Sequence, residues 1–255
     1  MSLSDQQIVD SQALVISVFK SLRETLLSGY GNFDHTSKSD HSPVTVYDVE
    51  VEETLKSRLA GAFPEIGFTG EETGVSGNTD TYWLVDPIDG TSSFIRGLPF
   101  CTNMAALVQD GQVIAAVIYD FVNDVLYTAL KGQGALKDGT PIHVKERPAG
   151  DHFIYSMTPS SIGPVKESLN ELKMRTLLPV GAAGHTYMQL AEGKIDGILN
   201  LNKGYGLHDN APGLFICEEA GVSVLQYDDN AGVYRNQFIL GSSIVVDSIE
   251  HSGLI

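Results

Sequence analysis

The sequence predicts a mixed α+β / α/β protein with layered sheets, and three observations support this prediction. Apolar residues first recur at helical spacing, between about residues 15 and 59. Short apolar runs separated by tight turns then fill residues 103–144, which is typical of an antiparallel meander. After Pro148, runs of strand length alternate with helical patterns.

The first half should begin with two helices. Ser4 and Gln7 have the spacing of a capping box for a helix that ends near Gly29. Asp48 is expected to open a second amphipathic helix, which Pro64 stops. Extended segments are expected at residues 44–46, 66–69 and 82–85.

The second half should alternate strands and helices. Strands are predicted at residues 153–157, 176–180, 195–199, 222–225 and 238–246, and helices at 165–172, 182–192 and 210–220. No stretch rich in proline, serine and glycine separates the two halves. We therefore expect a single domain over residues 1–255, with lobes at about 1–147 and 148–255.

Charge and composition exclude several classes of function. Sixteen basic and 32 acidic residues give a formal net charge of −16, which argues against binding to nucleic acid or to an anionic membrane surface. The longest apolar stretch is far shorter than a membrane helix, and the start MSLSDQQ lacks a secretory pattern. Two cysteines suit a reducing compartment, so we expect a cytoplasmic protein.

Carboxylates gather after two predicted strands. Glu71 and Glu72 follow the first of these strands, and Asp86 and Asp89 end the second. Their oxygens could hold a hard divalent cation such as magnesium, because a metal compensates the repulsion between clustered acids. The backbone amides that could hold a phosphate there are those of Gly90, Thr91 and Ser92.

These acids also allow other interpretations. Taken singly, an Asp-Pro or Asp-Gly pair is usually a turn, and Thr91 could be a helix cap. DPIDGTSSFIRG lacks the ligand spacing of an EF-hand, and DPIDGT is one residue longer than the DxDGT of haloacid-dehalogenase-like phosphatases. The sequence also contains no GxSxG, HExxH, P-loop or GxGxxG motif.

Four segments carry a resemblance to a known family: SPVTVYD, IGFTGEETG, WLVDPIDGTSSFIRGLPF and LHDNAPGLFICEEAG. In this order they resemble the inositol monophosphatases, a group of magnesium-dependent, lithium-sensitive sugar phosphatases. The resemblance implies an αβαβα sandwich, a homodimer and hydrolysis of a small phosphorylated substrate. It also implies two or three Mg²⁺ per active site, with Mn²⁺ as an alternative.

The resemblance assigns roles to individual residues. It implies a first magnesium on Glu71, Asp86 and the carbonyl of Ile88, and a second on Asp86, Asp89 and Asp209. Thr91, with Asp48 or Glu71, would position and deprotonate the attacking water. The implied substrate contacts are Asp89, Gly90, Thr91, Ala183, Asn202, Lys203 and Asp209. Spacing alone would make Asp209 an N-cap of the helix at 210–220 and would not single out Asp48.

Departures from the family pattern concern the substrate. His208 replaces a tryptophan, and we favour a packing role for it over a metal-binding or proton-transfer role. Asn202 and Lys203 stand where inositol monophosphatases place a glutamate that contacts inositol hydroxyls, and His185 stands at a usually apolar or small position. The expected substrate is inositol 1-phosphate; histidinol phosphate, a sugar bisphosphate and a non-enzymatic metal-binding scaffold are the alternatives.

Overall fold

The computed structural model describes residues 2–39, 42–148, 152–157, 166–178, 182–201, 206–226 and 237–252 of the chain. Its strands form an eight-stranded sheet, a five-stranded sheet and a hairpin of β1 (Thr36–Ser37) and β2 (Pro43–Val44). Among these residues, no helix combines the length and the apolar character that a membrane span requires.

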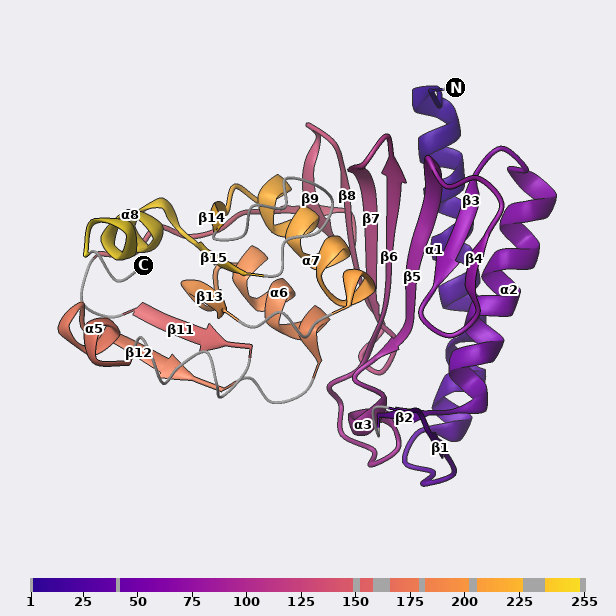
Figure 1. Cartoon of the computed structure of the whole chain (residues 1–255), viewed down its shortest axis with the longest axis horizontal. Helices are drawn as coiled ribbons and strands as arrows, with labels where there is room; N and C mark the ends of the chain where they lie inside the picture. The colour runs from indigo at the N-terminus through magenta and orange to yellow at the C-terminus, as the bar shows by residue number, and fades with distance from the viewer. Residues whose placement is uncertain are drawn as a thin grey trace.

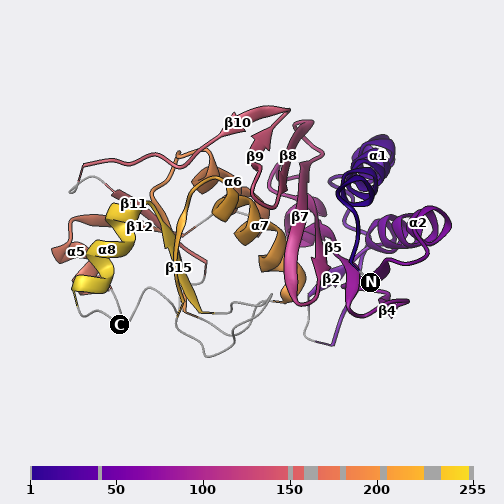
Figure 2. The same ribbon diagram turned by 90° about the horizontal axis from the view of Figure 1, so that it is seen from above.

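Helices and sheets alternate in five layers (Figure 1). The helices of the layers are α1 (Asp5–Gly29), α2 (Val46–Ala62), α5 (Lys166–Glu171), α6 (Ala183–Ala191), α7 (Leu207–Glu219) and α8 (Ser243–His251). α1 and α2 cover the outer face of the eight-stranded sheet, and α6 and α7 lie between the two sheets. α5 and α8 cover the outer face of the five-stranded sheet, as the view from above shows (Figure 2). The layered αβαβα sandwich is therefore confirmed.

The eight-stranded sheet has the order β10-β9-β8-β7-β6-β5-β3-β4. Its strands are β3 (Gly67–Gly70), β4 (Gly74–Ser76), β5 (Thr81–Asp89), β6 (Thr102–Gln109), β7 (Gln112–Asp120), β8 (Val125–Leu130), β9 (Gly134–Lys137) and β10 (Thr140–Ile142). From β5 to β10 each strand pairs antiparallel with the next, which confirms the predicted meander. β3 runs parallel to β5 with Gly70 opposite Val85, so the acidic segments after β3 and at the end of β5 are neighbours.

The five-stranded sheet has the order β12-β11-β13-β15-β14. Its strands are β11 (His152–Ser156), β12 (Met174–Leu177), β13 (Gly197–Asn200), β14 (Ser223–Gln226) and β15 (Phe238–Gly241). β11 pairs parallel with β12 and β13, whereas β15 is antiparallel to both of its neighbours. The predicted alternation of the second half is confirmed, with boundaries shifted by one to three residues at most ends.

Two large apolar cores flank the eight-stranded sheet. One lies between α1, α2 and the eight-stranded sheet and includes Phe19, Leu55 and Trp83, all fully buried. The other lies between the two sheets around α6 and α7 and includes Tyr187 and Ile198. Because helices cover both faces of β6, every one of its residues is buried. This strand and the end of β5 beside it are therefore rigid supports for the carboxylates described below.

Helix α2 begins earlier than predicted. The extended segment expected at residues 44–46 ends at Val44, and Thr45 is the N-cap of α2. The Thr45 hydroxyl accepts a hydrogen bond from the backbone N–H of Tyr47 at 3.2 Å, and Asp48 Oδ2 accepts one from the backbone N–H of Thr45 at 2.7 Å. Asp48 is thus the third residue of the helix in a capping box, not its first.

The strand predicted at residues 238–246 is wrong in its second half. β15 ends at Gly241, and Ser242 caps α8 by accepting a hydrogen bond from the backbone N–H of Val245 at 3.4 Å. Val245, Val246 and Ile249 are buried on one face of this helix. A short apolar run does not distinguish a buried strand from a buried helix, and the serine cap was the missed signal.

Candidate active site

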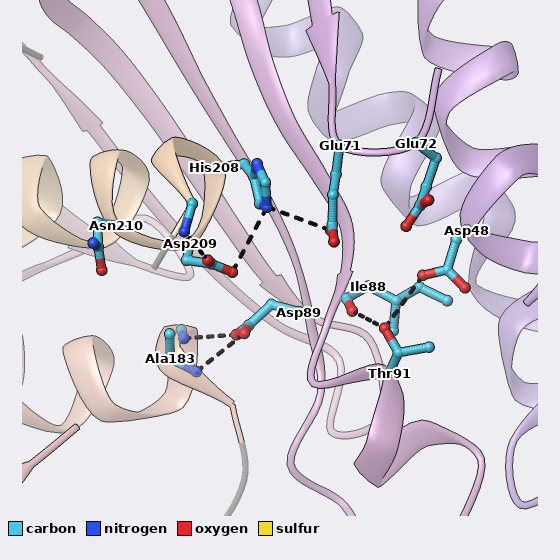
Figure 3. Close-up of polar contacts among 12 residues, drawn as sticks. Asp48, Glu71, Glu72, Ile88, Asp89, Thr91, Ala183, His208, Asp209 and Asn210 are labelled. Carbon is cyan, nitrogen blue, oxygen red and sulfur yellow. Dashed lines mark hydrogen bonds and ion pairs between the residues drawn. The ribbon is translucent and has the colours of Figure 1, made fainter. Parts of the chain in front are cut away.

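Carboxylates from four segments converge where strands β3 and β5 of the eight-stranded sheet end (Figure 3). Glu71 and Glu72 hang from the turn after β3, with Asp48 and Thr91 to one side and Asp89, His208 and Asp209 to the other. Two groups of three residues each offer ligand atoms that all lie within 4.8 Å of one another inside the group. One comprises Glu71, Asp86 and His208, and the other Asp86, Asp89 and Asp209. Asp86 belongs to both groups.

Asp86 lies where β5 departs from regular pairing with β6. The register is interrupted between Asp86 and Asp89, and the buried Asn103 side chain donates a hydrogen bond to the Pro87 carbonyl at 2.5 Å. Asp86 Oδ1 is buried and has no hydrogen-bond partner in the described part of the chain. Burial, and then the charges of neighbouring carboxylates, raise the pKa of Asp86 well above its ordinary value. This oxygen needs a positive partner.

Asp89 is held by the N-terminus of α6. Its Oδ1 accepts a hydrogen bond from the Ala183 N–H at 3.1 Å, and its Oδ2 accepts from the Gly184 N–H at 2.7 Å and the Thr102 hydroxyl at 3.1 Å. Burial raises the pKa of Asp89 to about 6, against the lowering effect of the Gly184 amide. The predicted site residue Ala183 therefore lies in the site, where its amide binds Asp89.

Glu71 is the first residue of the turn after β3. Its backbone N–H donates to the Val85 carbonyl at 3.2 Å, which ties the turn to β5. The Lys38 ammonium forms ion pairs with both Glu71 and Glu72. Burial alone would lower the pKa of Lys38, but its hydrogen bonds to the two glutamates raise it. Sequence reasoning missed Lys38, because a lysine in a polar loop carries no signal of its position.

The Thr91 hydroxyl lies between two oxygen atoms. It donates to the Ile88 carbonyl at 2.9 Å and lies 3.5 Å from Asp48 Oδ1. Burial raises the pKa of Asp48 to about 6, although hydrogen bonds from Thr45 lower it. A carboxylate with a pKa near neutrality, next to a threonine hydroxyl, suits proton transfer.

Gly90 makes the turn from β5 into α3 (Thr91–Phe94). Its φ of +83° is in the left-handed region. A Cβ there would come within 2.6 Å of the Phe100 carbonyl oxygen and 2.9 Å of Ala182 Cβ. Glycine is therefore required both by conformation and by space. Thr91 is the first residue of this helix and not its cap, because Gly90 is the N-cap and makes no side-chain hydrogen bond.

Helix α7 brings His208 and Asp209 to the site. It begins at Leu207, so Asp209 is its third residue and not the cap predicted by spacing, and Asp209 Oδ2 accepts from the Gly206 N–H at 2.6 Å. His208 Nε2 lies 3.6 Å from Glu71 Oε2 and 3.9 Å from Asp209 Oδ1. The imidazole therefore does more than replace the bulk of a tryptophan, because it lies beside Glu71 of one ligand group and Asp209 of the other.

The structure brings together most of the predicted site residues. The cluster contains Asp48, Glu71, Asp86, Ile88, Asp89, Gly90, Thr91, Ala183 and Asp209. Asn202 and Lys203 lie outside the described residues. Sequence reasoning missed three residues that contact the acidic segments of the cluster. Glu52 accepts a hydrogen bond from the Glu72 N–H, Lys38 pairs with Glu71, and Thr102 donates to Asp89.

His185 forms a pair that the sequence did not predict. Its Nε2 lies 3.0 Å from Asp120 Oδ2, and its ring meets Phe100 edge to face with centroids 6.0 Å apart. Burial raises the pKa of Asp120, but hydrogen bonds from His185 and Asn123 lower it by more, so this pKa lies below its ordinary value. The pair links α6, whose first amides bind Asp89, to the end of β7.

The carboxylate cluster fits a divalent cation. Among the described residues, Asp86 Oδ1 is a buried oxygen without a hydrogen-bond partner, and most of the possible ligand atoms are carboxylate oxygens, which magnesium prefers. Burial raises the pKa of Asp86, Asp89 and Asp209, and the charges of neighbouring carboxylates raise it further. The charged carboxylates therefore destabilise one another. A cation removes that repulsion.

Magnesium should therefore stabilise the metal-free protein. At a hundred times its dissociation constant, it should raise the free energy of unfolding by about 2.7 kcal/mol and the unfolding temperature by about 5–10 °C. The measurement is thermal unfolding after EDTA treatment, with added magnesium and with sodium chloride at equal ionic strength as the control. An unfolding temperature that magnesium moves no more than sodium would contradict a cation site.

Comparison with known proteins gives consistent matches. Residues 6–255 match the model of the inositol monophosphatase family. An inositol-1-monophosphatase of Rhizobium meliloti is 31% identical over 220 residues, 82% of each chain. A fructose-1,6-bisphosphatase/inositol-1-monophosphatase of Thermotoga maritima is 27% identical over 240 residues, 92% of each chain. Among solved structures, the extragenic suppressor protein suhB of Bartonella henselae has a TM-score of 0.83 at 26% identity, covering 95% of this chain and 98% of that one.

Proposed function

We propose that this chain, which belongs to the inositol monophosphatase family, is a magnesium-dependent phosphomonoesterase that hydrolyses a small polyol or sugar phosphate. Membership establishes a phosphatase of the hydrolase class; the cation, the site residues and the substrate are proposals. The observation that carries them is the pair of ligand groups that share Asp86, whose buried Oδ1 has no partner in the described chain. Two neighbouring cation sites with a bridging carboxylate suit phosphate transfer to water.

The cations would be held by the carboxylates of the two groups and by one backbone carbonyl. Glu71, Asp86 and the Ile88 carbonyl would bind one magnesium, and Asp86, Asp89 and Asp209 would bind a second. When bound, magnesium neutralises the phosphate, lowers the pKa of a coordinated water and stabilises the leaving oxygen. His208 lies 3.6 Å from Glu71 Oε2 and would orient that carboxylate. Manganese, which accepts the same oxygen donors, would be an alternative.

The attacking water would be positioned by Thr91. The hydroxyl lies 2.9 Å from the Ile88 carbonyl and 3.5 Å from Asp48 Oδ1, so it could accept a hydrogen bond from water and pass a proton toward Asp48. The raised pKa of Asp48, about 6, suits a group that takes up a proton near neutral pH. The backbone amides of Gly90 and Thr91 would hold the phosphate, since in-line attack needs mainly positioning.

The proposed substrate is inositol 1-phosphate, with a sugar bisphosphate as the second candidate. The first follows the name of the Rhizobium meliloti relative, and the second follows the two activities in the name of the Thermotoga maritima relative. Asn202 and Lys203, in place of a glutamate, favour substrates with extra negative charge. Ala183, Asn202, Lys203 and Asp209 would complete the substrate contacts. Histidinol phosphate remains in the test set.

A phosphate-release screen tests the function. The purified protein is assayed with inositol 1-phosphate, fructose 1,6-bisphosphate and histidinol phosphate, with magnesium, with manganese and with EDTA. We expect phosphate release from at least one ester with magnesium and none with EDTA. No release from any phosphomonoester, despite magnesium-induced stabilisation, would favour the non-enzymatic scaffold. We further propose that the protein is a cytoplasmic homodimer. Sedimentation of the purified protein tests the oligomeric state.

Lithium should inhibit the reaction at millimolar concentration without competing with the substrate. We place it in the group of Asp86, Asp89 and Asp209, where it would retain phosphate after hydrolysis. The measurement is the initial rate against substrate concentration at several lithium concentrations, with sodium and potassium as controls. Inhibition should lower kcat. Rates equal to those in sodium would argue against this assignment.

A further inference from the structure

Glu52 is a fully buried carboxylate behind the site. It lies on α2, one turn after Asp48, with an exposed fraction of 0%. Its Oε1 accepts a hydrogen bond from the Glu72 N–H at 2.9 Å, and its Oε2 accepts one from the Thr73 N–H at 2.7 Å. Within the described chain no lysine, arginine or histidine forms an ion pair with it, so backbone amides take the place of a cation.

The last glycine of β3 makes room for this contact. A Cβ at Gly70 would come within 2.1 Å of Glu52 Oε2, so the carboxylate lies directly against the strand end. The turn that follows is therefore fixed at both ends. On one side the Glu71 N–H donates to the Val85 carbonyl at 3.2 Å, and on the other Glu52 binds the next two amides.

We infer that Glu52 is a positioning residue for the cation site, because it holds the turn that presents Glu71 beside Asp86. It touches neither substrate nor cation. This inference rests on the proposed magnesium site. A partner that orients a ligand in this way commonly contributes about 10- to 100-fold to metal affinity. Burying a carboxylate without hydrogen-bond partners is costly, and the two amides that Glu52 binds offset this cost.

The test compares Glu52→Gln with Glu50→Gln by calorimetric titration of magnesium into the EDTA-treated protein without substrate. Glu50 lies on the exposed face of the same helix and is the matched control. Glutamine keeps the shape but replaces one acceptor oxygen with an amide group, so one backbone N–H loses its partner. We expect the magnesium dissociation constant to rise about 10- to 100-fold for Glu52→Gln and to stay unchanged for Glu50→Gln.

The kinetic prediction separates positioning from simple structural support. For Glu52→Gln, phosphate release should need more magnesium, but kcat at saturating magnesium should stay within about threefold of the wild type. An unchanged magnesium dissociation constant with a lower unfolding temperature would overturn the inference. If Glu52→Gln does not fold, Glu52→Asp, which keeps the charge but shortens the reach, is measured in the same way. If wild type binds magnesium but hydrolyses no ester, the proposed function fails, and the calorimetric comparison still decides the role of Glu52.

Discussion

Replacing Asp86 with asparagine should lower the rate of phosphate release at least about a thousandfold. Asp86 belongs to both ligand groups, so the change removes a charge from both proposed cation sites. A thousandfold loss corresponds to about 4 kcal/mol of transition-state stabilisation, which is within the several kcal/mol that a metal ion supplies. The measurement is kcat at saturating magnesium and substrate for Asp86→Asn and wild type.

Stability should change in the opposite direction. Burial and neighbouring carboxylates raise the pKa of Asp86, so its charged form destabilises the metal-free protein. The neutral asparagine removes that repulsion, and the metal-free variant should unfold at a temperature no lower than the wild type. Asp80→Asn, at an exposed carboxylate just before β5, is the control and should change neither property. Near-normal activity of Asp86→Asn at saturating magnesium would show that the site assignment is wrong.

Sequence patterns predicted the architecture better than they predicted element ends. The periodicity of α1 and the turns of the meander are local signals, and both elements formed as predicted. The ends depended on caps: Thr45, Gly206 and Ser242 begin helices at points that apolar spacing did not mark. Spacing alone would consequently make Asp209 a cap, whereas it is the third residue of its helix.

Residue spacing, without the family resemblance, predicted the site only where its residues are close in sequence. Glu71, Asp86 and Asp89 follow neighbouring strands, and the parallel pairing of β3 with β5 brings them together. Asp48 and Asp209 reach the same point from α2 and α7, which spacing alone could not reveal. The roles of Glu52 and Lys38 are harder still to predict. In the sequence, a buried glutamate and an ion-paired lysine cannot be told from ordinary residues of a solvated helix and loop. Their roles depend on contacts between segments.

The second large effect is expected at Thr91. Thr91→Val keeps the volume and removes the hydroxyl, so the contacts with the Ile88 carbonyl and with Asp48 Oδ1 are both lost. We expect kcat to fall by about a hundredfold or more, the scale of one positioned proton-transfer group. Magnesium affinity should change less than kcat, because Thr91 is not among the proposed cation ligands and only donates a hydrogen bond to one of them, the Ile88 carbonyl.

Thr91→Ser is the matched variant, because serine retains the hydroxyl and loses only a methyl group. Its kcat should stay within about tenfold of the wild type, with the same magnesium affinity by calorimetry. Asp48→Asn should lower kcat to a level similar to that of Thr91→Val, and combining the two should cost little more, since residues that act as one unit are not additive. Full activity in Thr91→Val would contradict a role for the hydroxyl. Additive losses in the double variant would mean that Thr91 and Asp48 act separately, with Glu71 then the remaining candidate for the proton acceptor.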